Sequence, residues 1–228
     1  MLISLFTALV TALVLTSGCS SDKKSSEPLP DAATLLKDST ATTKAQQSAH
    51  LVITVTGEIK KLPITSLTGD LTNTPAVAAS GKADITALGT KLEGVGFVVI
   101  DGTLYGALTP DSWTDFGPAA DIYDVSAILN PDRGLANLLA NFSDPKAVDR
   151  ENVNGVDTIK VTGTVAPQGV NGLLPQLAAT APMPGTAWIS AADDHKLVQV
   201  KVEPAQGTSI QLTTSDWGKP VTVTKPAV

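Results

Sequence analysis

The stretch PDSWTDFGPAADIYDVSAILNPDRGLANLLANFS, Pro110 to Ser143, breaks a chain that otherwise alternates like β-structure. Its apolar spacing is helical, because Val125 and Ile128 follow Asp124, a residue type that caps helices. The run NPD at residues 130–132 then favours a second helical start. The apolar stripe after it comprises Leu135, Leu138, Leu139 and Phe142. Such a stripe must lie on something apolar, so we predict a helical cover across the open side of a strongly curved sheet.

On both sides of this stretch the sequence predicts β-strands joined by tight turns. Asp101-Gly102 and Asn154-Gly155 are typical of two-residue hairpins. Helices are predicted at residues 31–49, capped by Asp31, and more loosely at residues 167–179. The predicted strands span residues 51–56, 64–72, 77–88, 91–100, 103–108, 147–153, 156–165, 186–190, 197–202, 209–217 and 221–224. About ten antiparallel strands with helices gathered on one side predict an α+β fold in a single domain, residues 31–228.

Composition and charge narrow the range of partners. The chain has 228 residues and a net charge of −6, and no basic cluster is longer than Lys23-Lys24 or Lys60-Lys61. Because nucleic acid is recognised through basic patches, this charge pattern argues against a nucleic-acid partner. Hydrophobic residues make up 43% of the chain, yet nine residues in all are aromatic. The apolar mass is therefore Val, Leu, Ile and Ala.

The amino terminus has the features of a secretory targeting segment. Residues 1–18 contain a short apolar run that ends in small residues before Cys19. A lone cysteine in this position resembles a bacterial lipobox, which implies signal cleavage, acylation of Cys19 and a membrane anchor. Residues 19–30 then form a flexible linker rich in Ser, charge and Pro. The alternative is a free thiol at Cys19, and with no second cysteine neither interpretation allows an intrachain disulfide.

Small side chains at alternating positions raise the question of a hollow interior. Ala83, Ile85 and Ala87 alternate on one predicted strand, and Gly94 and Gly96 stand at alternating positions of its neighbour. Protein interiors are close-packed, so inward positions of this kind need bulk from elsewhere. Two interpretations stay open. Leu and Ile from the helices fill the interior completely, or an apolar cavity stays empty until a lipid enters.

The sequence offers no catalytic motif. The two histidines, His50 and His195, stand outside any recognised pattern, and neither Gly-x-Ser-x-Gly nor His-Glu-x-x-His occurs. Four aspartates gather in one region, but their spacing is not that of an EF-hand, and carboxylates that cap helices explain them as well. These are Asp111, Asp115, Asp121 and Asp124. We therefore predict a protein that is not an enzyme and has no metal or cofactor, with esterase activity as the alternative.

Four longer runs carry a family resemblance. They are FVVIDGTLYGALTP (residues 97–110), GPAADIYD (117–124), NPDRGLANLLANF (130–142) and WGKPVTVTKP (217–226). From Leu29 to the C-terminus the chain resembles the LprG/LppX/LprA/LprF family of mycobacterial cell-envelope lipoproteins, and within it the LprG type. The resemblance implies an antiparallel half-barrel, backed on one side by helices, around a large apolar cavity.

The same resemblance implies ligands, a partner and a location. Proteins of the LprG type bind triacylated lipids and glycolipids, namely phosphatidylinositol mannosides, lipomannan, lipoarabinomannan and triacylglycerol. They act with a major-facilitator efflux pump to move these lipids to the outer envelope. We therefore expect a lipid-anchored protein on the outer face of the inner membrane, in the periplasm, with a further fraction in the cell wall or secreted. The alternative is a scaffold that holds glycolipid for the pump without transferring it. The expected cavity lining comprises Ala83, Ile85, Ala87, Gly94, Gly96, Leu135, Leu138, Leu139 and Phe142.

Overall fold

A computed structural model describes residues 27–87 and 89–228. The predicted signal segment 1–18, Cys19 and most of the predicted linker lie outside the described residues. The strands are β1 Ser48–Thr56, β2 Ile64–Thr72, β3 Ala78–Ala87, β4 Thr90–Ile100, β5 Thr103–Thr109, β6 Ser112–Pro118, β7 Phe142–Val153, β8 Val156–Val165, β9 Met183–Ser190, β10 Leu197–Val202 and β11 Ser209–Ser215. The α-helices are α1 Ala32–Lys44, α2 Leu135–Ala140 and α3 Pro167–Leu173. Shorter 3-10 turns are η1 Ala119–Asp121, η2 Val125–Ala127 and η3 Pro175–Leu177.

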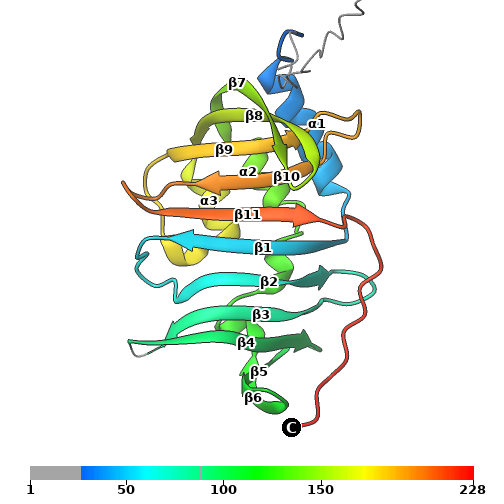
Figure 1. The fold of residues 1–228 in the computed structure, drawn as a ribbon, viewed down its shortest axis with the longest axis vertical. Helices are drawn as coiled ribbons and strands as arrows, with labels where there is room; N and C mark the ends of the chain where they lie inside the picture. The colour runs from blue at the N-terminus through cyan, green and yellow to red at the C-terminus, as the bar shows by residue number, and fades with distance from the viewer. Residues whose placement is uncertain (1–26, 88) are drawn as a thin grey trace, which may run out of the picture.

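All eleven strands belong to one antiparallel sheet. Its order is β6-β5-β4-β3-β2-β1-β11-β10-β9-β8-β7, so two meanders are joined where β1 pairs with β11. Strands β6 and β7 form the two edges, which leaves the sheet open instead of closed into a barrel (Figure 1). The predicted α+β half-barrel is therefore confirmed.

Turn chemistry sets much of this register. Asp101 and Gly102 have φ values of 52° and 75°, and Asn154 and Gly155 have 51° and 87°. Two successive left-handed residues are what a type I′ hairpin requires, and the Asp-Gly and Asn-Gly pairs tolerate that conformation best. Both predicted hairpins are confirmed, β4 to β5 and β7 to β8.

The helices cover one half of the sheet. Helix α1 packs on α2 and contacts β7 and β9, while α2 packs on α3. Figure 1 shows the three helices gathered over β7–β11. Side chains from this region are fully buried, among them Leu135, Leu138, Leu139, Ile159, Val161, Val165, Val170, Ile189 and Leu197. We call β7–β11 with the three helices the packed half, and β1–β6 the open half.

The central stretch differs from its prediction at both ends. Residues 112–118 form the edge strand β6, because the two-residue loop Pro110-Asp111 turns the chain back on β5. The second helix begins at Leu135 and not at Pro131, since Gly134 first closes a turn on the Asn130 carbonyl. Phe142 belongs to β7. The cap is confirmed, since Asp124 Oδ1 accepts a hydrogen bond from the Ser126 amide at 3.1 Å, although η2 spans a single 3-10 turn.

Two further boundaries differ from the prediction. Helix α1 has the expected Asp31 cap but ends at Lys44, because the chain enters β1 at Ser48. Residues 221–224 form no strand. The C-terminal tail leaves β11 and runs beside the strand ends toward β5 and β6 (Figure 1), and the Lys225 ammonium lies 5.4 Å from the Tyr105 ring centroid. A tail that passes the strand ends instead of lying parallel to an edge strand has no ladder to join.

Candidate binding cavity

A cavity of about 600 Å³ lies on the inner face of the open half. This volume falls within the ~300–1,000 Å³ typical of ligand pockets. Its walls come mainly from the inner faces of β1–β6, from β10 and β11, and from residues 119–134, which we call the cover segment, while α2 and α3 contribute Leu138 and Leu173. Four lining residues are polar, Lys61, Asp70, Tyr123 and Gln176, and all others are apolar or glycine. Such a lining accepts hydrocarbon and offers little to a polar ligand.

The cavity exists because the helices stop short of this half. The burial of inner-face side chains decreases along β1, since Leu51 is buried while Ile53 and Val55 are half-buried. All three line the cavity. On the packed half the equivalent inner-face side chains are covered by helices, whereas here the cover segment contributes 3-10 turns and single side chains.

The predicted small residues of β3 stand in the cavity wall. Ala83, Ile85 and Ala87 all line it. Ala83 lies directly opposite Leu67 of β2 and Val95 of β4, which line the cavity too, so one inward row crosses three strands. The three residues that alternate in the sequence of β3 therefore share one face of the sheet, and that face lines the cavity.

Gly94 and Gly96 do not leave the inward face bare. Gly94 has φ 64° and lies at a bulge, where its amide donates to Asp84 Oδ1 at 2.7 Å, and it is absent from the lining. Gly96 contributes to the lining, but a Cβ there would point to the outer face, 3.3 Å from the Trp113 ring. The extra residue of the bulge shifts the strand's alternation, so the prediction of a bare inner face at these two positions is wrong.

Other glycines open the inward face instead. Gly69 and Gly81 lie directly opposite each other on β2 and β3, and Phe97 lies opposite Gly81. A Cβ at Gly69 would stand 3.1 Å from the Phe97 ring, and one at Gly81 would stand 2.9 Å from it. Phe97 therefore lies flat across both strands and forms part of the cavity floor.

The apolar stripe of the central stretch divides between two places. Leu138 lines the cavity. Leu135 and Leu139 are 0% and 1% exposed and belong to the core of the packed half, outside the lining. Phe142 lies still further away on β7, where its ring would contact a Cβ at Gly163 or Gly185. The prediction of these three as lining residues is wrong because α2 packs among α1 and α3 instead of over the open half.

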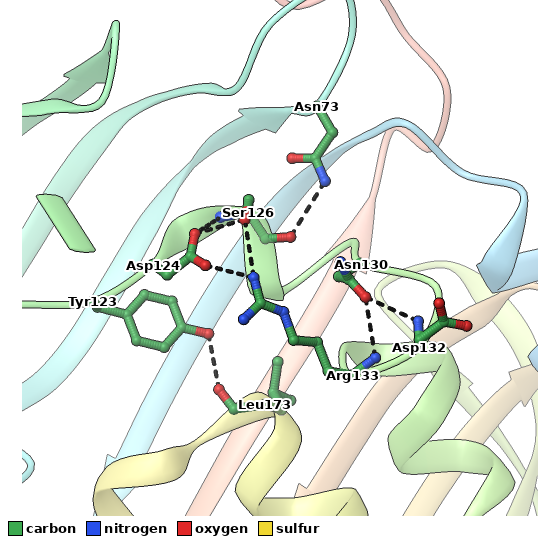
Figure 2. Close-up of polar contacts among 8 residues, drawn as sticks. All are labelled: Asn73, Tyr123, Asp124, Ser126, Asn130, Asp132, Arg133 and Leu173. Atoms are coloured by element: carbon green, nitrogen blue, oxygen red, sulfur yellow. Dashed lines mark hydrogen bonds and ion pairs between the residues drawn. The ribbon is translucent and has the colours of Figure 1, made fainter.

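Polar contacts fasten the cover segment at its margins, as Figure 2 shows. The Tyr123 hydroxyl donates to the Leu173 carbonyl at 2.9 Å, and Asn73 Nδ2 donates to the Ser126 carbonyl at 3.2 Å. Arg133 forms an ion pair with Asp124, which also accepts from Ser126 Oγ at 2.6 Å. These contacts tie the segment to β2 and α3 while its apolar side chains face the cavity.

The surroundings of Tyr123 and Asp124 keep each of these two groups in one protonation state at neutral pH. Burial raises the pKa of the Tyr123 hydroxyl, and the neighbouring Asp124 carboxylate acts in the same direction. The hydrogen bond from Ser126, together with Arg133, holds the pKa of Asp124 below its usual range. At neutral pH the phenol therefore stays a donor and the carboxylate stays ionised.

Several lining residues were not singled out from the sequence. They are inner-face residues of β1, β2, β4, β5 and β6, namely Leu51, Ile53, Val55, Leu67, Phe97, Leu104 and Phe116. The period-two alternation of β1 is a signal that could have found three of them. The four clustered aspartates form no candidate cation site, since no group of three possible metal ligands occurs within residues 27–87 and 89–228.

The sequence pattern of the LppX_LprAFG lipoprotein family matches residues 31–223 of this chain. The chain belongs to this family. It is 56% identical over 227 residues to the lipoarabinomannan carrier protein LprG of Mycolicibacterium hassiacum, covering 99% of this chain and 98% of that protein. The family predicted from the four sequence runs is therefore confirmed.

Solved structures of the family have the same fold. The crystal structure of LprF from Mycobacterium bovis matches with a TM-score of 0.79 at 32% identity, covering 88% of this chain and 99% of that chain. The crystal structure of Mycobacterium tuberculosis LppX matches with a TM-score of 0.65 at 31% identity, covering 86% of this chain and 100% of that chain.

Proposed function

We propose that this lipoprotein binds the acyl chains of lipids and glycolipids in its cavity and carries them toward the outer envelope. The observation that carries the proposal is an apolar cavity between the inner face of the sheet and the cover segment, with Leu138 of α2 and Leu173 of α3 at its helical side. An acyl chain in water costs about 0.8 kcal/mol for each exposed CH₂ group. A dry apolar cavity removes that cost, and with it the main barrier to moving a lipid through the periplasm.

The ligand class follows from the shape of the site and from the relatives. The acyl chains enter the cavity and the head groups stay outside it, because the lining offers few polar groups, namely Lys61, Asp70, Tyr123 and Gln176. Relatives at 44–56% identity are named lipoarabinomannan carrier proteins. We therefore propose triacylated lipids and glycolipids as ligands, namely phosphatidylinositol mannosides, lipoarabinomannan and triacylglycerol.

The setting of the protein is part of the same proposal. We infer that Cys19 carries the lipid anchor, that residues 1–18 are removed, and that residues 19–30 link the anchor to the folded domain at the outer face of the inner membrane. In this position the protein meets lipid that a major-facilitator efflux pump supplies. The part of the chain that the structure describes contains no helix long and apolar enough to span a bilayer.

Ala83→Trp tests the proposal. The indole would project into the cavity between Leu67 and Val95 and exclude acyl chains. Lys82→Trp is the matched control, because Lys82 is the exposed neighbour on the same strand and is absent from the lining. Native mass spectrometry should find lipid bound to the wild type and to Lys82→Trp, and little bound to Ala83→Trp, with unchanged circular dichroism. Equal lipid loading of both variants would contradict this site.

Two alternatives have their own discriminating measurements. A scaffold that holds glycolipid without transferring it would bind lipid but deliver none to acceptor vesicles. An esterase would hydrolyse short acyl esters. The carrier proposal expects delivery to vesicles and no hydrolysis.

A further inference from the structure

The cavity opens at a group of exposed apolar side chains. Leu108 is 60% exposed, Phe116 49% and Ile122 58%. All three line the cavity, although they come from β5, from β6 and from the residue after η1. We call them the mouth rim. Folding leaves these three apolar side chains in water although most of the lining is buried or half-buried apolar surface, which is the usual sign of a contact surface.

The other exposed large hydrophobic residues of the described chain stand elsewhere. Val52, Val148 and Val156 lie on strands β1, β7 and β8, Val228 is the last residue of the chain, and none of the four lines the cavity. Single exposed valines of this kind are normal on a protein surface. The mouth rim differs because its three side chains adjoin one opening, which gives them a shared role.

The position of the rim identifies its partner by chemistry. Leu108, Phe116 and Ile122 are exposed and also belong to the lining, so they join the cavity wall to the surface of the protein. A protein partner would ordinarily meet an apolar centre surrounded by a polar margin. Here the centre is the opening of a cavity lined by apolar side chains. An acyl chain that leaves it stays out of water only if the opening lies against the hydrocarbon interior of a membrane.

We propose that the mouth rim docks directly on a lipid bilayer, so that a ligand passes between cavity and membrane without crossing water. This inference rests on the proposed function. With a net charge of −6 the protein gains no overall attraction to an anionic membrane. The contact is therefore apolar, and it should persist on zwitterionic vesicles and at high salt, where charge attraction is screened.

Local fluorescence provides the test. In the full chain with Cys19→Ser no cysteine remains, so Ile122→Cys can be labelled alone with a dye that brightens in apolar surroundings. Val148→Cys is the matched control, since Val148 is 46% exposed and lies on the opposite edge strand. On addition of phosphatidylcholine vesicles the dye at position 122 should brighten several-fold, with no change at position 148. Because residues 1–26 are the same in both proteins, any affinity they have for vesicles cannot distinguish the two dyes.

Each other outcome overturns the docking. No response at position 122, or an equal response at both positions, excludes the rim as the membrane contact. A response that follows protein concentration without vesicles would assign the rim to a contact between two copies. Absence of bound lipid from the wild-type protein would instead refute the proposed function itself, because lipid content is measured without vesicles.

Transfer kinetics give a second readout. Leu108→Ser with Phe116→Ser removes two apolar contacts, each worth roughly tenfold in partitioning between water and an apolar phase. Val148→Ser with Val156→Ser is the control pair. The rate of triacylglycerol transfer to acceptor vesicles, per loaded molecule, should fall at least tenfold in the rim variant and stay at the wild-type value in the control. Equal rates per loaded molecule in both variants would contradict the inference.

Discussion

At the scale of the residue, small side chains on the inner face create the space. Ala83 and the glycine pair Gly69 and Gly81 leave room that Phe97 spans but does not fill. The glycines are also required for close strand contact, because a Cβ at Gly81 would collide with the Thr68 carbonyl oxygen and stand 2.6 Å from Gly69 Cα. Two neighbouring rows of the sheet therefore differ in role: the row of Ala83 lines the cavity, and the row of Gly69 and Gly81 allows close strand contact beneath Phe97.

Gly81→Ala should destabilise the protein by about 1–3 kcal/mol, because the added methyl overpacks the contact with β2. Urea unfolding measures this as a lower midpoint at constant slope. Lys82→Ala is the control on the exposed face of the same strand and should change stability by less than about 0.5 kcal/mol. An unchanged midpoint in Gly81→Ala would show that the sheet relaxes around the methyl.

Residue patterns predict part of this site. The alternation of Ala83, Ile85 and Ala87 is visible in the sequence, and all three residues line the cavity. The face of Gly96 is not visible, because it depends on the bulge at Gly94 and on the Asp84 side chain ten residues earlier. A bulge changes the alternation by one residue, and no composition signal marks it here.

At the scale of the element, the cover segment replaces a helix over the open half. Its 3-10 turns place Ile122, Val125 and Ile128 in the cavity wall, and polar contacts at its margins hold it there. The caps at Asp31 and Asp124 could be predicted, because each depends on a hydrogen bond two or three residues away. Strand β6 could not, since its formation depends on the turn at Pro110-Asp111 and on pairing with β5.

Acid should weaken the fastening of the cover segment. The pKa of Asp124 is lowered in the folded protein, so the stability from its ionised form is present at neutral pH and is lost as the pH falls below about 4. Asp124→Asn removes this dependence. The loss in free energy of unfolding between pH 7 and pH 3, measured by urea unfolding, should be smaller in the variant than in the wild type. The difference should be less than about 1 kcal/mol, because the side chains of Arg133 and Asp124 are 49% and 40% exposed.

Asp132→Asn serves as the control for this measurement, since the Asp132 side chain is 83% exposed. It should keep the wild-type difference between pH 7 and pH 3. If Asp124→Asn also keeps the full wild-type difference, the fastening at Asp124 and Arg133 does not contribute to the acid dependence.

At the scale of the whole molecule, function follows from an unequal division of one sheet. Three helices fill the packed half, and the open half keeps its hollow (Figure 1). The strand order places the mouth rim near edge strand β6, while the described chain begins beside the other edge, where Arg150 of β7 donates to the Pro28 carbonyl at 3.2 Å.

This division could not be predicted from the sequence alone. The apolar stripe with Leu135 and Leu139 predicts a helix that covers part of the sheet. The helix does so, but it covers strands that come after it in the chain. Which half a short helix covers depends on the long-range pairing of β1 with β11 and on the contacts of α1. Local periodicity contains neither kind of information. The half-barrel is therefore predicted through the family resemblance, and the sequence alone leaves open whether its interior is filled or contains a cavity.

The lipid content of the wild-type protein tests the central claim most directly. The protein is purified from its own host without denaturation, extracted with organic solvent and analysed by mass spectrometry, and the intact complex is weighed in parallel. We predict acylated lipid or glycolipid in stoichiometric amount, lost when Ala83→Trp fills the cavity. A wild-type protein that carries no lipid, and takes up none from vesicles of its host's lipids, would contradict the account.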